Sequence, residues 1–417
     1  MSKIAIVGGK ELSGEIKLQG AKNSVLPVLA ATLLCSGKSV VHNCPNISDV
    51  ETSVKILTAL GCTCQREGNS IIVDTTNISN YEIPDDLMRE MRSSVVFLGA
   101  VIGRMGKALI SSPGGCELGP RPIDLHLSAL KKMGVVINEE HGYLNCFAPN
   151  GILGTEITLG FPSVGATENI ILAAATAKGM TVIHNAAKEP EISDLADFLN
   201  SAGARIYGGG SDTVCIYGVE ILKATEHTII PDRIVAATYM SAVAMTGGKI
   251  VIKGIMPSHM TSSLSVFREA GCDVSVSGKA LSLSCKNGLS RVPTIRSLVY
   301  PGFPTDAGPL VIAMLSKAKG TSVFVENIFE NRFRYVDELK RLGAKIETQG
   351  KTAVIEGVES LWGASCKCTD LRGGAALVLA GLSATGKTVI DEIYHIERGY
   401  DDIVGVLKSI GANIEYI

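Results

Sequence analysis

Short amphipathic runs that end at a glycine recur along the whole chain. Val50, Val54 and Leu57 are three and four residues apart and precede Gly61, a spacing that puts apolar side chains on one face of a helix. Glycine supplies the left-handed backbone that commonly ends a helix. Glycines at this point of the pattern recur about 70 residues apart, at Gly61, Gly134, Gly203, Gly271, Gly343 and Gly411. A second set has similar spacing: Gly37, Gly106, Gly179, Gly248, Gly320 and Gly386.

The two glycine sets divide the chain into six copies of one unit. Alternating apolar and polar residues follow each helix stop, as in residues 345–348 and 352–355 on either side of a Gln-Gly-Lys turn, and this alternation predicts a hairpin. Each unit therefore reads as βαβαββ. Because single hydrophobic cores stop growing near roughly 250 to 300 residues, we predict an α/β protein of two similar domains with three units each.

The sixth unit lacks its last strand. It ends with residues 413–417, whereas its five siblings continue into a partner strand. Residues 3–9 have the pattern of that missing strand, and residues 14–18 resemble residues 154–159, which precede the leading helix of the third unit. We therefore predict one domain over residues 22–230 and a second domain built from residues 1–21 plus 231–417.

Composition narrows the class of protein. The chain of 417 residues has 19% charged residues and a net charge of -2. It has no Lys/Arg-rich run and no apolar stretch near the ~20 residues that span a membrane, so neither nucleic acid nor membrane is an expected partner. The N-terminal residues lack the features of a secretory signal, and the eleven cysteines show no disulfide-like or metal-like spacing. We expect a cytoplasmic monomer without metal or cofactor.

Cations stand where the leading helices of several units begin. A helix start presents unpaired N–H groups and the positive end of the helix dipole, so a cation there opposes the dipole unless an anion lies between them. We therefore predict anion binding near Lys22, Arg92, Arg233 and Arg372. Simple N-capping explains the acidic and hydroxyl residues at these starts about as well, namely Asp232, Thr305 and Asp370.

The second unit carries about four extra residues in the loop around Cys116, where the insertion is rich in Gly and Pro and suggests a functional loop rather than a packing element. Arg121 follows five residues later, a cation that favours a thiolate or attracts a phosphate. A free cysteine is more often a small buried apolar residue, so both interpretations stay open for Cys116. Cys44 lies in the equivalent loop of the first unit without a nearby cation, and we interpret it as structural.

Three arginines fall at equivalent places in the last two units. Arg332 and Arg398 end their loops, and Arg372 begins a helix. Taken singly, Arg332 and Arg398 are explained by surface ion pairs with their neighbours Glu330 and Glu397. Taken together, three converging guanidiniums suit a ligand that has a carboxylate and a phosphate. Asp306 is the one carboxylate among these cations, and we expect it to accept a proton from a substrate hydroxyl.

At these residues the chain resembles the enolpyruvyl transferase family, in the branch that acts on UDP-N-acetylglucosamine. The matching motifs run from end to end, and the Cys116 loop separates this branch from the shikimate-type enolpyruvyl transferases. The segments that carry the resemblance are residues 20–23, 91–93, 113–116, 121–126, 163–167, 231–233, 303–306, 329–333, 369–372 and 394–400.

The resemblance implies a fold and a reaction. The fold would be an inside-out α/β barrel in each domain, with an active-site cleft between the domains. The reaction would transfer enolpyruvate from phosphoenolpyruvate to the 3-hydroxyl of UDP-N-acetylglucosamine and release phosphate by addition and elimination. This transfer is the first committed step of peptidoglycan precursor synthesis, and so of cell-wall biogenesis.

The resemblance also implies roles for individual residues. Cys116 would be the general acid and the site of a covalent adduct, and Asp306 would take the hydroxyl proton, with Lys22 and Arg398 completing the catalytic set. Phosphoenolpyruvate would be bound by Lys22, Asn23, Arg121, Arg332, Arg372 and Arg398. UDP-N-acetylglucosamine would be bound by Asn23, Arg92, Arg121, Pro122, Ile123, Asp124, Leu125, Ser163, Val164, Gly165, Asp306 and Ile328.

The chain departs from the family pattern in two places. Phe161-Pro162 precedes Ser163 where some members carry Lys-Val, and residues 307–309 read Ala-Gly-Pro where a Gln-containing stretch is expected. Two alternatives to the leading function therefore stay open. One is a noncatalytic paralogue that binds the nucleotide sugar, and the other is a shikimate-type enolpyruvyl transferase.

Overall fold

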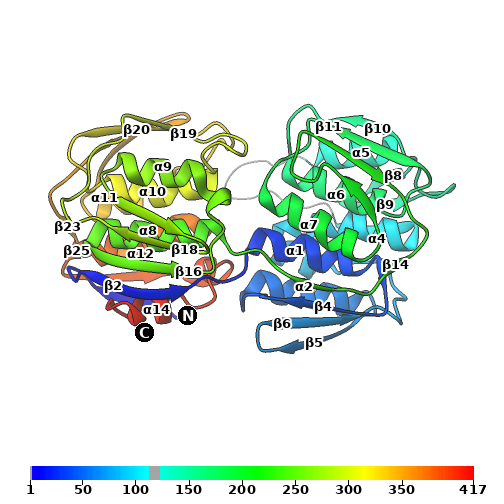
Figure 1. The fold of residues 1–417 in the computed structure, drawn as a ribbon, viewed down its shortest axis with the longest axis horizontal. Coiled ribbons are helices and arrows are strands. Elements are labelled where there is room, and N and C mark those ends of the chain that lie inside the picture. The colour runs from blue at the N-terminus through cyan, green and yellow to red at the C-terminus, as the bar shows by residue number, and fades with distance from the viewer. Residues whose placement is uncertain (1, 112–122) are drawn as a thin grey trace. The chain divides into compact units, whose positions relative to one another are not determined.

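The structure is a computed structural model that describes residues 2–111 and 123–417 (Figure 1). The described residues form two compact units of mixed α/β structure. One unit spans Gly20–Ile230, and the other joins the residues up to Gln19 with Pro231–Ile417. We call them the 20–230 unit and the 231–417 unit and describe each by itself. No helix in the described ranges is both long enough and apolar enough to span a membrane.

The 20–230 unit alternates helices and short strands. Its helices are α1 Lys22–Thr32, α2 Ser48–Ala59, α3 Asp85–Glu90, η1 Arg92–Val96, α4 Phe97–Met105, α5 Asp124–Lys132, α6 Val164–Ala174 and α7 Pro190–Ser201. Its strands are β3 Cys35–Ser36, β4 Lys38–His42, β5 Thr63–Glu67, β6 Ser70–Asp74, β7 Lys107–Ser111, β8 Val136–Glu140, β9 Tyr143–Phe147, β10 Glu156–Thr158, β11 Met180–His184, β12 Arg205–Tyr207, β13 Thr213–Tyr217, β14 Leu222–Lys223 and β15 Glu226–Thr228.

The 231–417 unit has the same character. Its helices are α8 Arg233–Thr246, η2 Pro257–Met260, α9 Thr261–Glu269, η3 Thr305–Ala307, α10 Gly308–Leu315, α11 Val336–Arg341, α12 Leu371–Ser383, α13 Tyr394–Glu397 and α14 Ile403–Ser409. Its strands are β1 Ile4–Val7, β2 Leu12–Lys17, β16 Gly248–Lys253, β17 Asp273–Ser277, β18 Ala280–Ser284, β19 Thr294–Arg296, β20 Thr321–Val325, β21 Lys345–Gln349, β22 Thr352–Glu356, β23 Leu361–Trp362, β24 Ser365–Lys367, β25 Ala384–Thr385, β26 Lys387–Asp391 and β27 Asn413–Tyr416.

The sheets repeat one pairing pattern. In β19-β20-β22-β21, the first pair is parallel and the next two pairs are antiparallel. The same order of parallel and antiparallel pairs recurs in four other sheets: β10-β11-β13-β12, β15-β4-β6-β5, β2-β16-β18-β17 and β24-β26-β1-β27. Sheet β7-β9-β8 has three strands, with a single parallel bridge from Glu82 to Leu109 in place of a fourth. The repetition follows the glycine spacing of the sequence.

The N-terminal strand completes the last of these sheets. β1 lies between β26 and β27 and pairs antiparallel with both. Ile4 and Ile6 are buried within this sheet. The prediction that the first residues supply the strand missing from the sixth unit is therefore confirmed at the level of strand pairing.

The marker glycines have the backbone conformation that the pattern requires. All twelve have positive φ, from 67° at Gly106 to 104° at Gly203 and Gly411, a region that side-chain-bearing residues rarely adopt. The predicted helices before Gly61 and Gly411 are α2 and α14, and the predicted hairpin is β21–β22.

Each unit has its own apolar core. In the 231–417 unit the helices α8, α10 and α12 contact one another, and nearly every residue of these helices is buried. In the 20–230 unit α1 and α6 both contact α4. Burial on all sides explains why these helices lack the polar stripe of a surface helix. Their first turns are the places where polar side chains gather.

Candidate active site

The structure describes most of the predicted site residues. Cys116, Arg121 and Pro122 lie outside the described residues, and the side chain of Arg92 is likewise not described. The roles predicted for these four therefore stay predictions. The remaining candidates fall into two groups, one in each unit.

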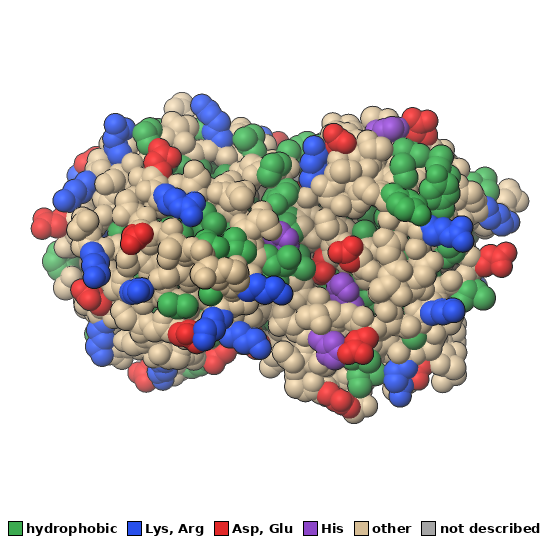
Figure 2. All heavy atoms as spheres, in the orientation of Figure 1, with side chains coloured by type: hydrophobic (Ala, Val, Ile, Leu, Met, Phe, Trp, Pro, Cys, Tyr) green, Lys and Arg blue, Asp and Glu red, His purple; other side chains and the backbone are tan. Residues whose placement is uncertain are grey.

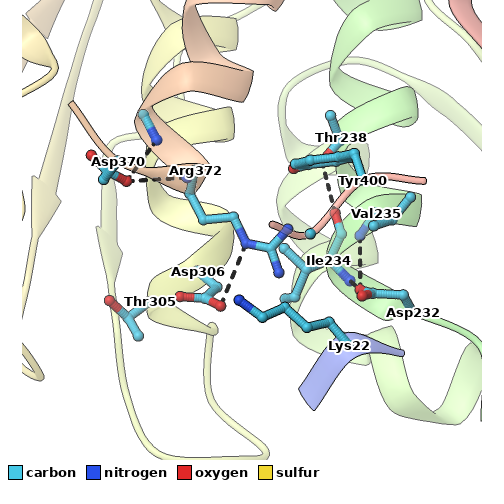
Figure 3. A network of polar contacts seen from close by, with 12 residues as sticks. Lys22, Asp232, Ile234, Val235, Thr238, Thr305, Asp306, Asp370, Arg372 and Tyr400 are labelled. Atoms are coloured by element: carbon cyan, nitrogen blue, oxygen red, sulfur yellow. Dashed lines mark hydrogen bonds and ion pairs between the residues drawn. The ribbon is translucent and has the colours of Figure 1, made fainter. Parts of the chain in front are cut away.

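Asp306 lies against two arginines in the 231–417 unit, and Figure 3 shows its contact with one of them, Arg372. Arg332 donates from Nη2 to Asp306 Oδ1 at 2.8 Å, and Arg372 Nε lies 3.5 Å from Asp306 Oδ2. The side chains of Arg332 and Arg372 are 3% and 2% exposed, whereas that of Asp306 is 29% exposed. A carboxylate that solvent still reaches is thus held by two buried cations.

The two arginines have unused hydrogen-bonding capacity. Among the described residues, Arg332 Nε and two nitrogens of Arg372, Nε and Nη1, are buried without a hydrogen-bond partner. A buried N–H group without an acceptor is costly, and the two guanidiniums outnumber the one carboxylate that they contact. A bound anion would supply both the acceptors and the charge, preferentially a carboxylate or a phosphate.

Arg372 is fixed by its helix start and by Tyr400. Asp370 caps α12 by accepting from the backbone N–H groups of Arg372 at 3.1 Å and Gly373 at 2.9 Å. The Tyr400 ring lies 5.4 Å from Arg372 Cζ, and its hydroxyl is 2.8 Å from Thr238 Oγ1. Burial alone would lower the pKa of Arg372, but Tyr400 and Asp306 raise this pKa above its ordinary value. The Arg372 guanidinium therefore stays protonated.

Two of the three predicted N-caps are real. Asp370 caps α12, and Asp232 caps α8 by accepting from the N–H groups of Ile234 and Val235 (Figure 3). Thr305 makes no side-chain cap. Its hydroxyl donates instead to Glu326 Oε2 at 2.7 Å, a contact that the sequence did not indicate.

The Ala-Gly-Pro departure after Asp306 has a structural explanation. Ala307 ends η3, and Gly308 begins α10 directly after it. Pro309 lies in the first turn of α10, where the missing N–H is no loss. A Cβ on Gly308 would lie 2.8 Å from Phe324 Cζ, so the aromatic packing there requires glycine. The departure leaves Asp306 in contact with both arginines.

Arg398 and Ile328 complete the candidates in this unit. Arg398 is half-buried and forms the C-cap of α13, next to Gly399, whose carbonyl accepts from Gln19. Ile328 is half-buried, and its backbone N–H donates to Glu326 Oε1 at 2.7 Å. Because Thr305 Oγ1 also donates to Glu326, this carboxylate links Ile328 to the turn that holds Thr305.

Lys22 is a buried cation of the 20–230 unit. It opens α1, is 8% exposed, and its Nζ lies 2.7 Å from Asp49 Oδ2. Asp49 is 2% exposed and was not predicted, because an acidic residue in the first turn of α2 looks like ordinary helix-dipole compensation. Asn23 is exposed in the same turn as Lys22. This turn is closely packed, since a Cβ on Gly20 would lie 1.8 Å from Asn43 O.

The predicted uridine segments come together within the 20–230 unit. Ser163 caps α6 by accepting from the N–H of Ala166, and a Cβ on Gly165 would lie 3.0 Å from His126 Cε1. His126 lies in the first turn of α5, so the half-buried Ile123 and Leu125 and the exposed Asp124 lie at the same end as the half-buried Ser163, Val164 and Gly165.

His126 has a core role. Its Nδ1 lies 2.9 Å from Asn169 Nδ2, and burial lowers its pKa to about 4. The ring is therefore neutral near pH 7, with Nδ1 accepting the hydrogen bond from the Asn169 amide. Asn169 Oδ1 in turn accepts from the N–H of Gly99 at 2.6 Å. This buried network was not predicted.

Several described cysteines are unsuited to acid–base or nucleophilic chemistry. Burial raises the pKa of Cys35, Cys44 and Cys62 to about 12. Cys44 donates from Sγ to the carbonyl of Val41, which agrees with its structural interpretation. No group of three His, Cys, Asp or Glu side chains in the described ranges could hold a metal ion.

Replacing the buried Glu168 of α6 with glutamine is expected to stabilise the protein increasingly as the pH rises. Burial, then Glu191 and Glu189, raise the pKa of Glu168 well above its ordinary value. The folded state therefore holds a proton that the unfolded state releases, and stability falls as the pH rises from about 4.5 through the folded pKa, by about 1.4 kcal/mol per pH unit. Glu168→Gln removes this titration.

Urea unfolding at pH 5, 6.5 and 8 measures the effect. The advantage of Glu168→Gln over the wild type should be smallest at pH 5 and largest at pH 8. Glu140→Gln, at an exposed position of the same unit, should show no such trend. A constant difference across this range would mean that Glu168 is already ionised in the folded protein.

Comparisons with known proteins place this geometry in a family. A family model described as EPSP synthase (3-phosphoshikimate 1-carboxyvinyltransferase) matches residues 6–407. Solved structures share the fold: the enolpyruvyl transferase NikO from Streptomyces tendae superposes with a TM-score of 0.88 at 24% identity, covering 100% of this chain and 98% of its own. EPSP synthase from Acinetobacter baumannii gives 0.76 at 17% identity, covering both chains fully. The chain belongs to the enolpyruvyl transferase family.

Relatives with much higher identity define the branch. UDP-N-acetylglucosamine 1-carboxyvinyltransferase 2 of Caldanaerobacter subterraneus subsp. tengcongensis is 51% identical over 99% of both chains. UDP-N-acetylglucosamine 1-carboxyvinyltransferase 1 of Staphylococcus aureus is 46% identical over 100% of both. Within the family, the chain therefore groups with the UDP-N-acetylglucosamine 1-carboxyvinyltransferases.

Proposed function

We propose that this protein transfers the enolpyruvyl group of phosphoenolpyruvate to the 3-hydroxyl of UDP-N-acetylglucosamine and releases inorganic phosphate. The hydroxyl oxygen bonds to C2 of phosphoenolpyruvate while C3 gains a proton, which gives a tetrahedral ketal. Loss of phosphate from C2 and of a proton from C3 then restores the vinyl group. The product is a precursor for peptidoglycan synthesis. The identity of 46–51% to carboxyvinyltransferases along the whole chain supports this assignment.

The observation that carries the proposal is the group formed by Asp306, Arg332 and Arg372. We assign the two buried guanidiniums to the carboxylate of phosphoenolpyruvate, because three of their nitrogens lack a hydrogen-bond partner among the described residues and guanidinium N–H groups donate readily to carboxylates. Asp306 is a partly exposed carboxylate beside both of them, and we assign it to the proton of the sugar hydroxyl. Protein cations neutralise the anionic substrate in this scheme.

The remaining roles are assigned by the resemblance of the motifs. We propose Cys116 as the general acid at C3 and as the site of a covalent adduct. Lys22, Arg121 and Arg398 then bind the phosphate, with Asn23 beside them. For UDP-N-acetylglucosamine we propose contacts from Arg92, Arg121 to Leu125, Ser163 to Gly165, Asp306 and Ile328. The placement of Ile123 to Leu125 beside Ser163 to Gly165 in one unit supports the shared nucleotide role.

We also propose that the two units are the first and second enolpyruvyl transferase domains, each built from three βαβαββ units as an inside-out α/β barrel. The recurring sheet pattern and the buried leading helices support this architecture. On the face of each unit drawn in Figure 2, cationic and anionic side chains are interspersed, which suits small anionic substrates bound at local sites rather than a polyanion. The ten described cysteines are all free thiols, in keeping with a cytoplasmic location.

Phosphate release with alternative acceptors tests the function. With saturating phosphoenolpyruvate, the wild type should release phosphate with UDP-N-acetylglucosamine and should fail to do so with shikimate 3-phosphate. Cys116→Ser should slow the release by about 10²-fold or more, as the loss of a general acid does. Cys44→Ser is the matched control, because the Cys44 thiol is buried and structural; it should keep the wild-type rate once folded.

The same experiment separates the alternatives. Release with shikimate 3-phosphate alone would assign the protein to the shikimate-type enzymes. Binding of UDP-N-acetylglucosamine without any phosphate release would identify a noncatalytic nucleotide-sugar-binding paralogue. Either result contradicts the proposed function.

A further inference from the structure

Glu326 is a buried carboxylate that the assigned roles leave unused. It follows β20 directly and is 1% exposed. Its backbone N–H donates to Lys351 O at 2.7 Å, so the main chain is fixed before the side chain enters the interior. A buried charge is retained only where hydrogen bonds compensate for its lost hydration.

Four donors from three segments converge on this carboxylate. Oε1 accepts from Ser297 Oγ at 2.7 Å and from the backbone N–H groups of Ile328 at 2.7 Å and Phe329 at 3.1 Å. Oε2 accepts from Thr305 Oγ1 at 2.7 Å. Three of the four are 2.7 Å long, and hydrogen bonds to a carboxylate are roughly twice as strong as bonds between neutral groups.

The segments that Glu326 ties together carry the site. Thr305 precedes Asp306 in η3, and its carbonyl accepts from Arg332 Nη2 at 3.4 Å. Phe329 lies under the Arg332 guanidinium, with its ring 5.4 Å from Arg332 Cζ. One carboxylate therefore fixes the backbone next to the proton acceptor and the loop that leads to the arginine.

Ser297 makes the arrangement rigid. Its hydroxyl donates to Glu326 and accepts from the N–H of Asn327 at 2.8 Å, and its carbonyl accepts from Asn327 Nδ2 at 3.0 Å. Glu326 therefore has one orientation, enforced from both sides. Polar networks with every member satisfied specify a single geometry.

We propose that Glu326 is a positioning residue for the transfer reaction: through Thr305 and the Ile328–Phe329 amides it holds Asp306 and Arg332 in their reactive geometry. The proposal rests on the proposed function for its kinetic consequence. Glu326 does not touch the substrates in this scheme. Loss of its link to Thr305 should displace Asp306, the proton acceptor, and so slow the chemical step, whereas its amide links toward Arg332 bear on the binding of phosphoenolpyruvate.

Thr305→Val tests the link without removing the buried charge. Valine keeps the shape of threonine and removes only the hydroxyl that donates to Glu326. A misplacement near 1 Å costs about 10²-fold, so kcat should fall 10- to 100-fold while KM for phosphoenolpyruvate stays within about threefold. Thr305→Ser restores the hydroxyl and should recover kcat to within about threefold of the wild type. Equal kcat for Thr305→Val and wild type, or no recovery by serine, overturns the proposal.

Hydrogen exchange supplies a readout that needs no turnover. Glu326→Gln keeps the size of the side chain and removes its charge, so exchange at the Ile328 and Phe329 amides should rise about tenfold, the loss expected from a charged to a neutral acceptor. The β20 amide of Val323, which is bonded to Pro293 O, should not change. Unchanged exchange at Ile328 and Phe329 overturns the positioning role. If the wild type releases no phosphate, the proposed function is overturned. The hydrogen-exchange result at Ile328 and Phe329 then still tests the positioning role of Glu326, because it does not depend on turnover.

Discussion

Asp306→Asn should lower kcat by about 10²- to 10⁴-fold, the range that a positioned general base contributes. Asparagine has the same shape and can still accept from Arg332, but it cannot take a proton from the sugar hydroxyl. KM for phosphoenolpyruvate should stay the same or fall, because the change removes a negative charge from beside two buried guanidiniums. Steady-state phosphate release at varied phosphoenolpyruvate measures both constants.

Asp337→Asn is the matched control for this prediction. Asp337 is in the same unit, and its side chain is 87% exposed, so its replacement should leave kcat within about twofold of wild type, as surface changes usually do. A kcat for Asp306→Asn close to that of the control would remove Asp306 from the chemistry. A large rise in KM with unchanged kcat would assign it to binding instead.

Arg372→Lys should lower kcat/KM for phosphoenolpyruvate by about 30- to 5,000-fold, which corresponds to the roughly 2–5 kcal/mol that breaking a buried, hydrogen-bonded charge pair costs. Lysine keeps the charge but loses the planar fork that binds a carboxylate through two hydrogen bonds. The Arg372 side chain is 2% exposed and lies against Asp306 and the Tyr400 ring. The ammonium group of a lysine, which is a single donor group on a shorter side chain, cannot reach both partners.

The control for this change is Arg341→Lys, because the Arg341 side chain is 59% exposed. It should behave as wild type. Titration calorimetry with phosphoenolpyruvate on both variants separates lost binding from lost chemistry. Wild-type affinity and kcat/KM in Arg372→Lys would show that this guanidinium does not meet the substrate.

Periodicity predicted the fold well because each marker acts locally. A glycine with positive φ ends its helix or turn wherever it stands, so Gly61 and Gly411 could be placed without tertiary information. The pairing of β1 with β27 followed from counting strands in a repeated unit. Sheet β7-β9-β8 has only a bridge at Glu82 in the place where the four-stranded sheets have their parallel edge strand. This difference was not predictable, because the loss of one strand leaves no periodic signal.

The site was predicted where a charged residue stood in a motif, at a helix start or a loop end, and missed where a buried acidic residue had no such motif. Arg332, Arg372 and Asp306 were singled out by their motifs and lie together. Asp49 and Glu326 were missed, because a sequence does not tell a buried acidic residue from an exposed one. Their partners, Lys22 in the first case and Thr305 in the second, are distant in the chain. Cys116 and Arg121 lie outside the described residues, and their roles stay predictions.

The product itself gives the most direct test of the central claim. The protein should be incubated with UDP-N-acetylglucosamine and phosphoenolpyruvate labelled with ¹³C at C2 and C3, and the products examined by NMR. The account predicts a labelled vinyl ether whose C2 couples to the proton on C3 of the sugar, together with an equal amount of free phosphate. Phosphate released with labelled pyruvate and an unchanged sugar nucleotide would contradict it, as would a vinyl ether at any other hydroxyl.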